Sequence, residues 1–185
     1  MKKILKKIFI LISKLIIPIF YKKTYLKGRW FENGVITGWI WCWQNLFMQR
    51  ICGYNKAPFP ISFRNVVSNY RNIKFHVDDL NNFQHFGCYF QTFGNGKIII
   101  GKGSYIAPNV GLITTNHDIT NLDNHVTPKN IILGRDCWIG MTSVILPGVE
   151  LGPKTIVGAG SVVTKSFIEG NCVIAGNPAK VIKRI

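Results

Sequence analysis

Two stretches decide the fold, IIIGKGSYIAPNVGLI at residues 98–113 and IILGRDCWIGMTSVILPGVELGPKTIVGAGSVVTK at residues 131–165. An aliphatic residue recurs in both at every sixth position. The nine positions, all Ile, Leu or Val, are Ile100, Ile106, Leu112, Leu133, Ile139, Ile145, Leu151, Val157 and Val163. A period of six matches neither an α-helix nor the alternation of a plain strand. It suits a short strand plus a turn, repeated on each side of a triangular coil.

The residues between the aliphatic positions favour the same interpretation. The fourth residue after seven of the nine is small or β-branched, as an inward side chain of a narrow coil should be: Ser104, Val110, Cys137, Ser143, Val149, Thr155 and Ser161. The third residue stands where a turn needs positive φ, which Gly, Asn and Asp tolerate best. The seven positions are Gly103, Asn109, Asp136, Thr142, Gly148, Lys154 and Gly160, and all but Thr142 and Lys154 satisfy that demand. The pattern predicts a parallel β-helix, in which Cys137 is an inward residue rather than a nucleophile.

The repeat is interrupted between Leu112 and Leu133, where three and a half periods pass before the next aliphatic position. We expect the extra residues to form a loop over about 113–132, and this loop carries His117 and Asp118. Loops on rigid scaffolds are where catalytic groups tend to lie. An imidazole, with an ordinary pKa near 6.5, is suited to accepting a proton from an alcohol at neutral pH. The loop is therefore the first place to seek an active site.

The ordered motifs IGKGSYIAPNV, TTNHD, ILGRDCWIG, ILPGVELG, IVGAGSVVTK and AGNPAKVIKRI resemble the hexapeptide-repeat acyltransferases. The similar branch holds galactoside, maltose and serine O-acetyltransferases and the streptogramin acetyltransferases, and the resemblance covers about residues 95–185. It implies a left-handed parallel β-helix, acetyl transfer from acetyl-CoA to a hydroxyl without a metal, and a homotrimer whose active sites lie between neighbouring coils.

The resemblance also implies roles for single residues. His117 stands at the position of the general base, and Asp118 could orient its ring. The backbone N–H groups around Gly140 and Met141 are the expected donors to the oxyanion that thioester attack creates. Trp138 is expected either to wall the acceptor site or simply to cover a face of the coil.

Coenzyme A and the acceptor have further expected contacts. The resemblance places six residues along the pantetheine arm and nucleotide phosphates, namely Ala159, Gly160, Thr164, Lys165, Lys180 and Lys183. Sugar-acetylating relatives carry a carboxylate where this chain has Asn95, so their acceptor recognition does not transfer. Asn95 and Gln91 could still hydrogen-bond an acceptor hydroxyl. We expect a building block of a surface polysaccharide such as capsule or O-antigen, with an antibiotic or other xenobiotic as the alternative.

Two rival functions use the same fold. A γ-type carbonic anhydrase needs three histidines converging on a metal, and only His117 and His125 lie in the repeat region. His125 has no counterpart in the family and is interpreted as a loop residue, while His76 and His85 remain unassigned. A non-catalytic β-helix binding protein would explain the repeats, but not the histidine-bearing loop together with the VVTK and GNPAKV segments.

The sequence suggests four parts. Residues 1–27 form a basic amphipathic segment, residues 28–97 an aromatic-rich irregular region with early coils, residues 98–176 the β-helix, and residues 177–185 a C-terminal cap. The aromatic residues of the second part are interpreted as core, and its short apolar runs favour short strands and irregular coil over long helices. Five cysteines without a CxxC pair indicate reduced thiols in the cytoplasm.

Charge is concentrated at the N-terminus. The net charge is +15, and nine cations precede Glu32, the first acidic residue. Because the cations lie in an apolar segment, they do not indicate a nucleic-acid-binding protein. The segment 1–23 fits neither a signal peptide nor a membrane span, since Lys14 interrupts the apolar run. Two interpretations stay open: a helix in the surface of an anionic membrane at its inner face, with Lys2, Lys3, Lys6 and Lys7 toward phosphates, or a helix packed on the protein.

Overall fold

The structure, a computed structural model, describes residues 2–185, except the side chain of Lys2, whose predicted lipid contact thus lies outside the described residues. The chain divides into two compact units, Met1–Phe63 and Arg64–Ile185. The first unit is helical, and its elements are α1 (Lys2–Phe20), the 3-10 helix η1 (Lys23–Tyr25), α2 (Thr37–Leu46) and the π-helix η2 (Phe47–Ile51). Within the described residues, no helix combines the length and apolar character needed to cross a membrane.

The expectation of irregular structure is wrong for Thr37–Ile51. Trp39, Cys42, Asn45 and Gln49 are buried there, at the three- and four-residue spacing of one helix face. Aromatic residues on the other faces hide this period in the sequence. The core of the unit includes a polar network in which the Gln49 side chain accepts from the Tyr21 hydroxyl at 2.8 Å and donates to the Asn55 carbonyl at 2.8 Å.

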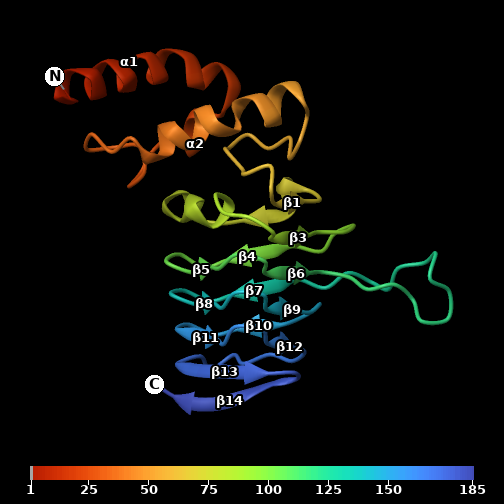
Figure 1. The fold of residues 1–185 in the computed structure, drawn as a ribbon. Helices are drawn as coiled ribbons and strands as arrows, with labels where there is room; N and C mark the ends of the chain where they lie inside the picture. The colour runs from red at the N-terminus through yellow and green to blue at the C-terminus, as the bar shows by residue number, and fades with distance from the viewer. Residues whose placement is uncertain (1) are drawn as a thin grey trace. The chain divides into compact units, whose positions relative to one another are not determined.

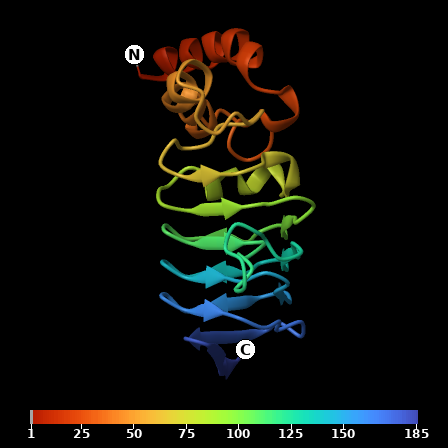
Figure 2. The ribbon, with the colours of Figure 1, turned by 90° about the vertical axis from the view of Figure 1, so that its right-hand side faces the viewer.

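The second unit is a coil of three sheets, whose strands pair in parallel except for the last, β14 (Figures 1 and 2). Sheet A has the order β1-β3-β6-β9-β12, sheet B β10-β7-β4-β2, and sheet C β14-β13-β11-β8-β5. The strand bounds are β1 Val66–Val67, β2 Ile73–Lys74, β3 Tyr89–Gln91, β4 Ile98–Ile100, β5 Tyr105–Ile106, β6 Gly111–Ile113, β7 Ile131–Leu133, β8 Trp138–Ile139, β9 Val144–Ile145, β10 Glu150–Leu151, β11 Thr155–Val157, β12 Val162–Val163, β13 Cys172–Gly176 and β14 Ala179–Arg184. The predicted parallel β-helix is confirmed.

The chain passes from sheet B to C to A and back to B, which gives the coil three corners. We name them by the sheets they join: the BC corner, the CA corner and the AB corner. Leu133 pairs with Leu151, three periods further along the chain, and this distance is one turn of the coil. Ile100 pairs with Leu133 in the same way, although five and a half periods separate them. The interruption therefore lengthens a single turn, and it does so at the AB corner.

The predicted interior and turns are confirmed. Each of the nine aliphatic residues at the sixth positions is at most 4% exposed, and each small residue four positions later is at most 1% exposed. All seven turn positions have positive φ, between +54° and +84°, including Thr142 and Lys154, whose side chains disfavour it. Cys137 points inward and contacts the Gly152 carbonyl at 3.2 Å, and burial raises the pKa of its thiol.

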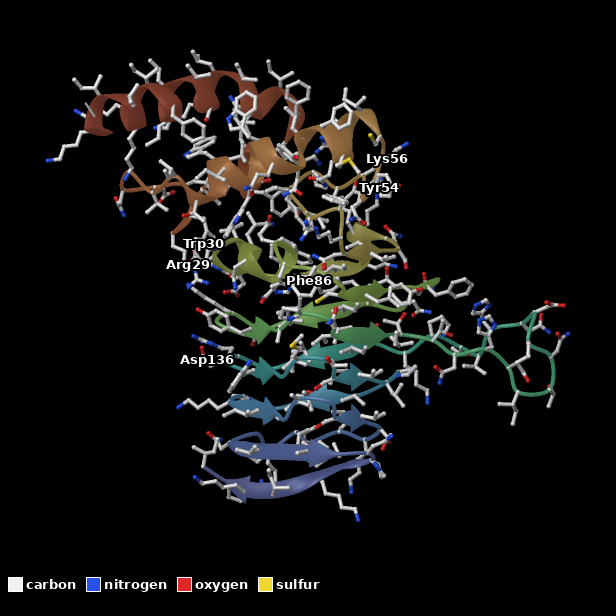
Figure 3. All side chains as sticks on the ribbon, in the orientation of Figure 1. Arg29, Trp30, Tyr54, Lys56, Phe86 and Asp136 are labelled. Atoms are coloured by element: carbon white, nitrogen blue, oxygen red, sulfur yellow. The ribbon has the colours of Figure 1, made fainter. Side chains whose placement is uncertain are left out.

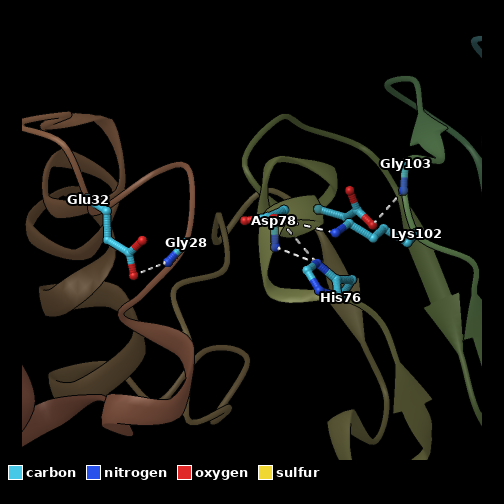
Figure 4. Close-up of polar contacts among 7 residues, drawn as sticks. Gly28, Glu32, His76, Asp78, Lys102 and Gly103 are labelled. Carbon is cyan, nitrogen blue, oxygen red and sulfur yellow. Dashed lines mark hydrogen bonds and ion pairs between the residues drawn. The ribbon is translucent and has the colours of Figure 1, made fainter.

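The coil begins upstream of residue 98, because β1, β2 and β3 already pair in the sheets. Sheet C has no strand in this first turn; the 3-10 helix η4 (Val77–Phe83) stands in its place. The side-chain amide of Asn82 makes the hydrogen bonds to β5 that a neighbouring strand would make. It accepts from Ile106 N at 2.9 Å and donates to the Ser104 carbonyl at 2.9 Å. Asp79 accepts from Gly103 N at 3.0 Å, and Asp78 lies 3.8 Å from Lys102 (Figure 4). A short 3-10 helix, η3 (Tyr70–Asn72), precedes β2.

The far end of the coil is covered by the chain's last residues. Strand β14 runs antiparallel to β13 and occupies the edge of sheet C. The segment predicted as a cap therefore pairs with the last turn of the coil, where it protects a strand edge.

Candidate active site

The inserted loop between β6 and β7 projects away from the coil (Figure 1). Its base is closed by a backbone hydrogen bond from Lys129 N to Thr114 O at 2.8 Å. Further out, Val126 N donates to Asn116 O at 3.0 Å, and His117 pairs with His125 in an antiparallel bridge. The loop is thus a narrow ribbon, which presents its histidines at a defined distance from the coil.

The His117 ring is oriented by the loop itself. Its Nδ1 lies 2.6 Å from the Leu122 carbonyl oxygen. A carbonyl can only accept, so Nδ1 must carry the hydrogen, and the neutral ring then has its lone pair on Nε2. The side chain is exposed, so Nε2 can reach a substrate hydroxyl. This is the tautomer that a general base requires.

The neighbouring Asp118 has other partners. Its Oδ1 accepts from the Thr120 hydroxyl at 2.6 Å and from Thr120 N at 2.8 Å. Both bonds lower the pKa of the Asp118 carboxyl, and the bond from the Thr120 hydroxyl has the larger effect. The carboxylate therefore shapes the turn of the loop, while the Leu122 carbonyl holds the His117 ring. Asp118 was expected to orient the His117 ring, but no hydrogen bond between these two side chains is found among the described contacts.

The ring of His125 lies beside that of His117 and stacks on Phe93, although the sequence analysis interpreted His125 only as a loop residue. The His125 ring stacks on Phe93 with centroids 4.3 Å apart and planes at 17°, and it lies 4.4 Å from the His117 ring. Phe93 stands at the AB corner of the preceding turn, and Thr114 Oγ1 accepts from its N–H at 3.1 Å. His117 is thereby connected to the rigid coil through His125. A second histidine in the same inserted segment was the available signal.

Gln91 and Asn95, the two predicted acceptor contacts at this corner, differ in whether their side chains are already hydrogen-bonded within the protein or exposed to solvent. The Gln91 Oε1 accepts from Thr114 N at 2.9 Å, and its Nε2 donates to Thr115 O at 3.3 Å. Gln91 therefore clamps the base of the loop. Asn95 lies in the exposed turn after Phe93, at the same corner, where its amide faces solvent.

Four predicted contacts of coenzyme A lie together at the CA corner. Gly140 and Met141 follow β8, and Ala159 and Gly160 follow β11 on the next turn. Gly160 N donates to Met141 O at 2.8 Å, while Gly140 N donates to Val157 O at 2.8 Å. The Gly140 N–H, a predicted donor to the oxyanion, is therefore already engaged in a hydrogen bond between two turns of the coil. A Cβ at Gly140 would lie 2.5 Å from Val157 O, so only glycine fits this approach between turns.

The other predicted residues are divided between two regions of the coil. Lys180 and Lys183 are exposed on β14, opposite Ala175 and Val173 of β13. Thr164 and Lys165 instead follow β12, at the AB corner. Trp138 is 54% exposed at the start of β8 on sheet C.

Within one chain the predicted site is therefore in two parts. The loop, Gln91, Asn95, Thr164 and Lys165 belong to the AB corner, whereas Gly140 to Met141 and Ala159 to Gly160 belong to the CA corner. The loop projects away from the coil on the side opposite Asp136, which marks the BC corner (Figure 3). One chain does not bring the base and the predicted thioester contacts together.

The remaining histidines lie outside the loop. His76 Nδ1 accepts from Asp78 N at 3.2 Å, next to helix η4. Burial lowers the pKa of His85, whose Nδ1 lies 3.6 Å from Cys88 Sγ. Among residues 2–185 as described, no cluster of three or more His, Cys, Asp or Glu side chains is arranged to hold a metal.

A coil built from six-residue repeats, with a histidine on the long loop between β6 and β7, defines the class, a hexapeptide-repeat β-helix. Residues 130–165 match the family described as bacterial transferase hexapeptide (six repeats). The resemblance to the hexapeptide-repeat acyltransferases is confirmed for this part of the chain.

Individual relatives agree with the family match. Over 95 residues the chain is 42% identical to galactoside O-acetyltransferase of Escherichia coli K12, covering 48% of this chain and 44% of that protein. It is 39% identical over 88 residues to WcaF of the same strain, named for an acetyltransferase of colanic acid biosynthesis, with 48% of each chain covered. A solved galactoside acetyltransferase in complex with coenzyme A is 40% identical, with 48% of this chain and 46% of that chain covered and a TM-score of 0.46. The chain spans about half the length of the curated relatives it matches.

Proposed function

We propose that this protein is an O-acetyltransferase that moves an acetyl group from acetyl-CoA to a hydroxyl of a saccharide. The observation that carries the proposal is the fixed tautomer of His117, whose Nδ1 is held by the Leu122 carbonyl at 2.6 Å while Nε2 is left to accept a proton. The names of the relatives, which are acetyltransferases, support the same reaction class.

The proposed reaction needs one base and no other group that changes charge. His117 Nε2 takes the proton of the acceptor hydroxyl as its oxygen attacks the thioester carbonyl of acetyl-CoA. The C–O bond forms and a tetrahedral oxyanion results. Its collapse breaks the C–S bond, and the departing thiolate receives the proton from the imidazolium. The products are an acetyl ester and free coenzyme A.

We propose a building block of a surface polysaccharide as the acceptor, and the cytoplasm as the place of reaction. The relative named for colanic acid biosynthesis supports this choice of acceptor. The exposed Asn95 amide, at the same corner as the loop, offers hydrogen bonds to a sugar hydroxyl. All five cysteines are free thiols, which suits a reducing compartment.

We further propose a homotrimer in which each active site uses two chains. The base lies at the AB corner, whereas the four predicted contacts around the thioester lie at the CA corner, so one coil alone leaves them apart. A neighbouring coil whose CA corner faces the loop would complete the site. Cyclic association of identical chains repeats such a contact three times.

Replacement of His117 by alanine tests the proposed chemistry. We expect turnover, measured as thiol release from acetyl-CoA with maltose, methyl galactoside and glucuronic acid as trial acceptors, to fall by roughly two to four orders of magnitude. The matched control is His76→Gln, a histidine remote from the loop, which should keep the wild-type rate. Circular dichroism checks that both variants fold. Near-normal turnover by the His117→Ala variant would reject the assignment.

A further inference from the structure

Helix α1 has one face that packs within the first unit. Ser13 and Ile17 on this face are 0% exposed. Ser13 Oγ accepts from Trp43 Nε1 of α2 at 2.9 Å and donates to Phe9 O at 2.8 Å. The interpretation of α1 as a packed helix is therefore right for this face.

The opposite face of α1 is apolar and uncovered. Its exposed residues, which we call the apolar stripe, are Ile4 (63%), Ile8 (48%), Leu11 (61%), Ile12 (44%), Leu15 (69%) and Ile19 (75%). At about 100° per residue these positions fall within one third of the helix circumference, so they form a continuous band. Contiguous exposed apolar surface of this kind marks an interaction site rather than an ordinary solvent face.

A row of lysines borders the apolar stripe. Lys3, Lys7 and Lys14 are exposed, and helical spacing places them together along one edge of the band. On the same side, Lys14 and Lys23 line a groove of about 730 Å³ with apolar side chains that include Ile10 and Leu26. Cations thus lie where the apolar surface ends, which is the arrangement of a helix at a lipid–water boundary.

The charge of the first unit is almost entirely uncompensated. Residues 1–63 contain 11 Lys and Arg and one acidic residue, Glu32. The Glu32 carboxylate accepts from Gly28 N at 2.9 Å and so closes its own loop (Figure 4). A second copy of the chain would present the same lysines and would repel the first. An anionic bilayer offers acyl chains for the apolar stripe and phosphates for the lysines.

We propose that α1 lies in the surface plane of an anionic bilayer, with the apolar stripe among the acyl chains and Lys3, Lys7 and Lys14 at the headgroups. The face that holds Ser13 and Ile17 stays packed on the protein. This surface belongs to the first unit, whereas the proposed chemistry belongs to the second, so either proposal can fail without the other.

Flotation of the full-length protein with lipid vesicles tests the proposal. We expect binding to vesicles of phosphatidylcholine with phosphatidylglycerol, little binding to phosphatidylcholine alone, and weaker binding as salt is raised. The double variant Leu11→Asp with Leu15→Asp should lose more than about 90% of the bound protein, because a charge on the apolar stripe opposes insertion. The control Ile168→Asp, at a residue 66% exposed in the second unit, should bind as the wild type does.

A second variant separates charge from folding effects. Lys7→Gln with Lys14→Gln should weaken binding by about 30-fold, since each lysine near an anionic surface is worth a factor of about five. Lys154→Gln is its control. Equal recovery of the wild type with neutral and anionic vesicles would overturn the proposal, as would unchanged binding by either double variant. A dimer that the Leu11 and Leu15 changes abolish, without vesicle binding, would assign the apolar stripe to a second copy instead.

Discussion

The side-chain contacts of His117 explain how an exposed loop can hold a base in place. One nitrogen is fixed by the Leu122 carbonyl, and one ring face lies against His125, which in turn stacks on Phe93 of the coil. Without these contacts the ring would sample several rotamers, and the entropy lost on reaching the reactive one would add to the barrier. His125 is in this view a positioning residue, because it acts through His117.

Substitution of His125 tests this positioning. His125→Ala removes both ring contacts, so we expect kcat to fall roughly 2- to 12-fold, the rate equivalent of one aromatic contact, with KM for acetyl-CoA unchanged. His125→Phe keeps a ring between Phe93 and His117 and should restore most of kcat. Steady-state kinetics of the two variants provide the comparison. Equal losses in both would instead show that the imidazole nitrogens of His125 matter.

At the scale of the element, the turns of the coil impose a conformation that some of their residues disfavour. Lys154 has φ of +54°, although an ordinary L-residue in the left-handed region costs about 1 kcal/mol. The ladder holds it there, since Lys154 N donates to Arg135 O at 2.8 Å. Asn109 and Asp136 occupy equivalent turns with residue types that tolerate this region.

Lys154→Asn should therefore stabilise the coil. We expect the free energy of unfolding to rise by about 0.5–1 kcal/mol, because asparagine adopts the left-handed conformation at lower cost. Urea unfolding followed by circular dichroism gives the measurement. Lys154→Ala, which removes the side chain without this conformational benefit, should not stabilise. Stabilisation by both variants to the same extent would point to the lost charge as the cause.

The same elements show what the sequence can predict. The period from Ile100 to Val163 determines the coil, because an aliphatic and a small inward residue on each side of the triangle form a purely local pattern. Helix α2 escapes prediction, because Trp41 and Trp43, at the borders of its buried face, are half-buried themselves and obscure the period. The bonds of Gln91 and Asp118 could not be predicted either, since a hydrogen bond between side chain and backbone leaves no periodic trace.

At the scale of the whole molecule, the separation of the two corners makes the proposed active site a property of the assembly. Mutation of the loop and mutation of the coenzyme A contacts would then damage different halves of the same site. Each half would come from a different chain.

Mixed assemblies test this sharing. Chains with His117→Ala and chains with Lys180→Glu and Lys183→Glu should each be nearly inactive alone. Refolded together in equal amounts, they should regain about a quarter of the wild-type activity, because that share of sites combines two intact halves. Wild-type protein taken through the same refolding is the reference. Activity no higher than the sum of the parents would mean that each site lies within one chain.

The closed base of the loop has an evolutionary consequence. Because Lys129 N and Thr114 O join the two ends of the insertion, β4 still pairs with β7 and β6 with β9, as if the extra residues were absent. The coil is thus indifferent to the length of what it carries at this corner. The loop can therefore change in evolution independently of the repeats, which are limited by their buried side chains and by the positive φ of their turns. A replacement loop would leave these strand pairs in place and would need to match the coil only at Gln91 and Phe93, which contact the present loop.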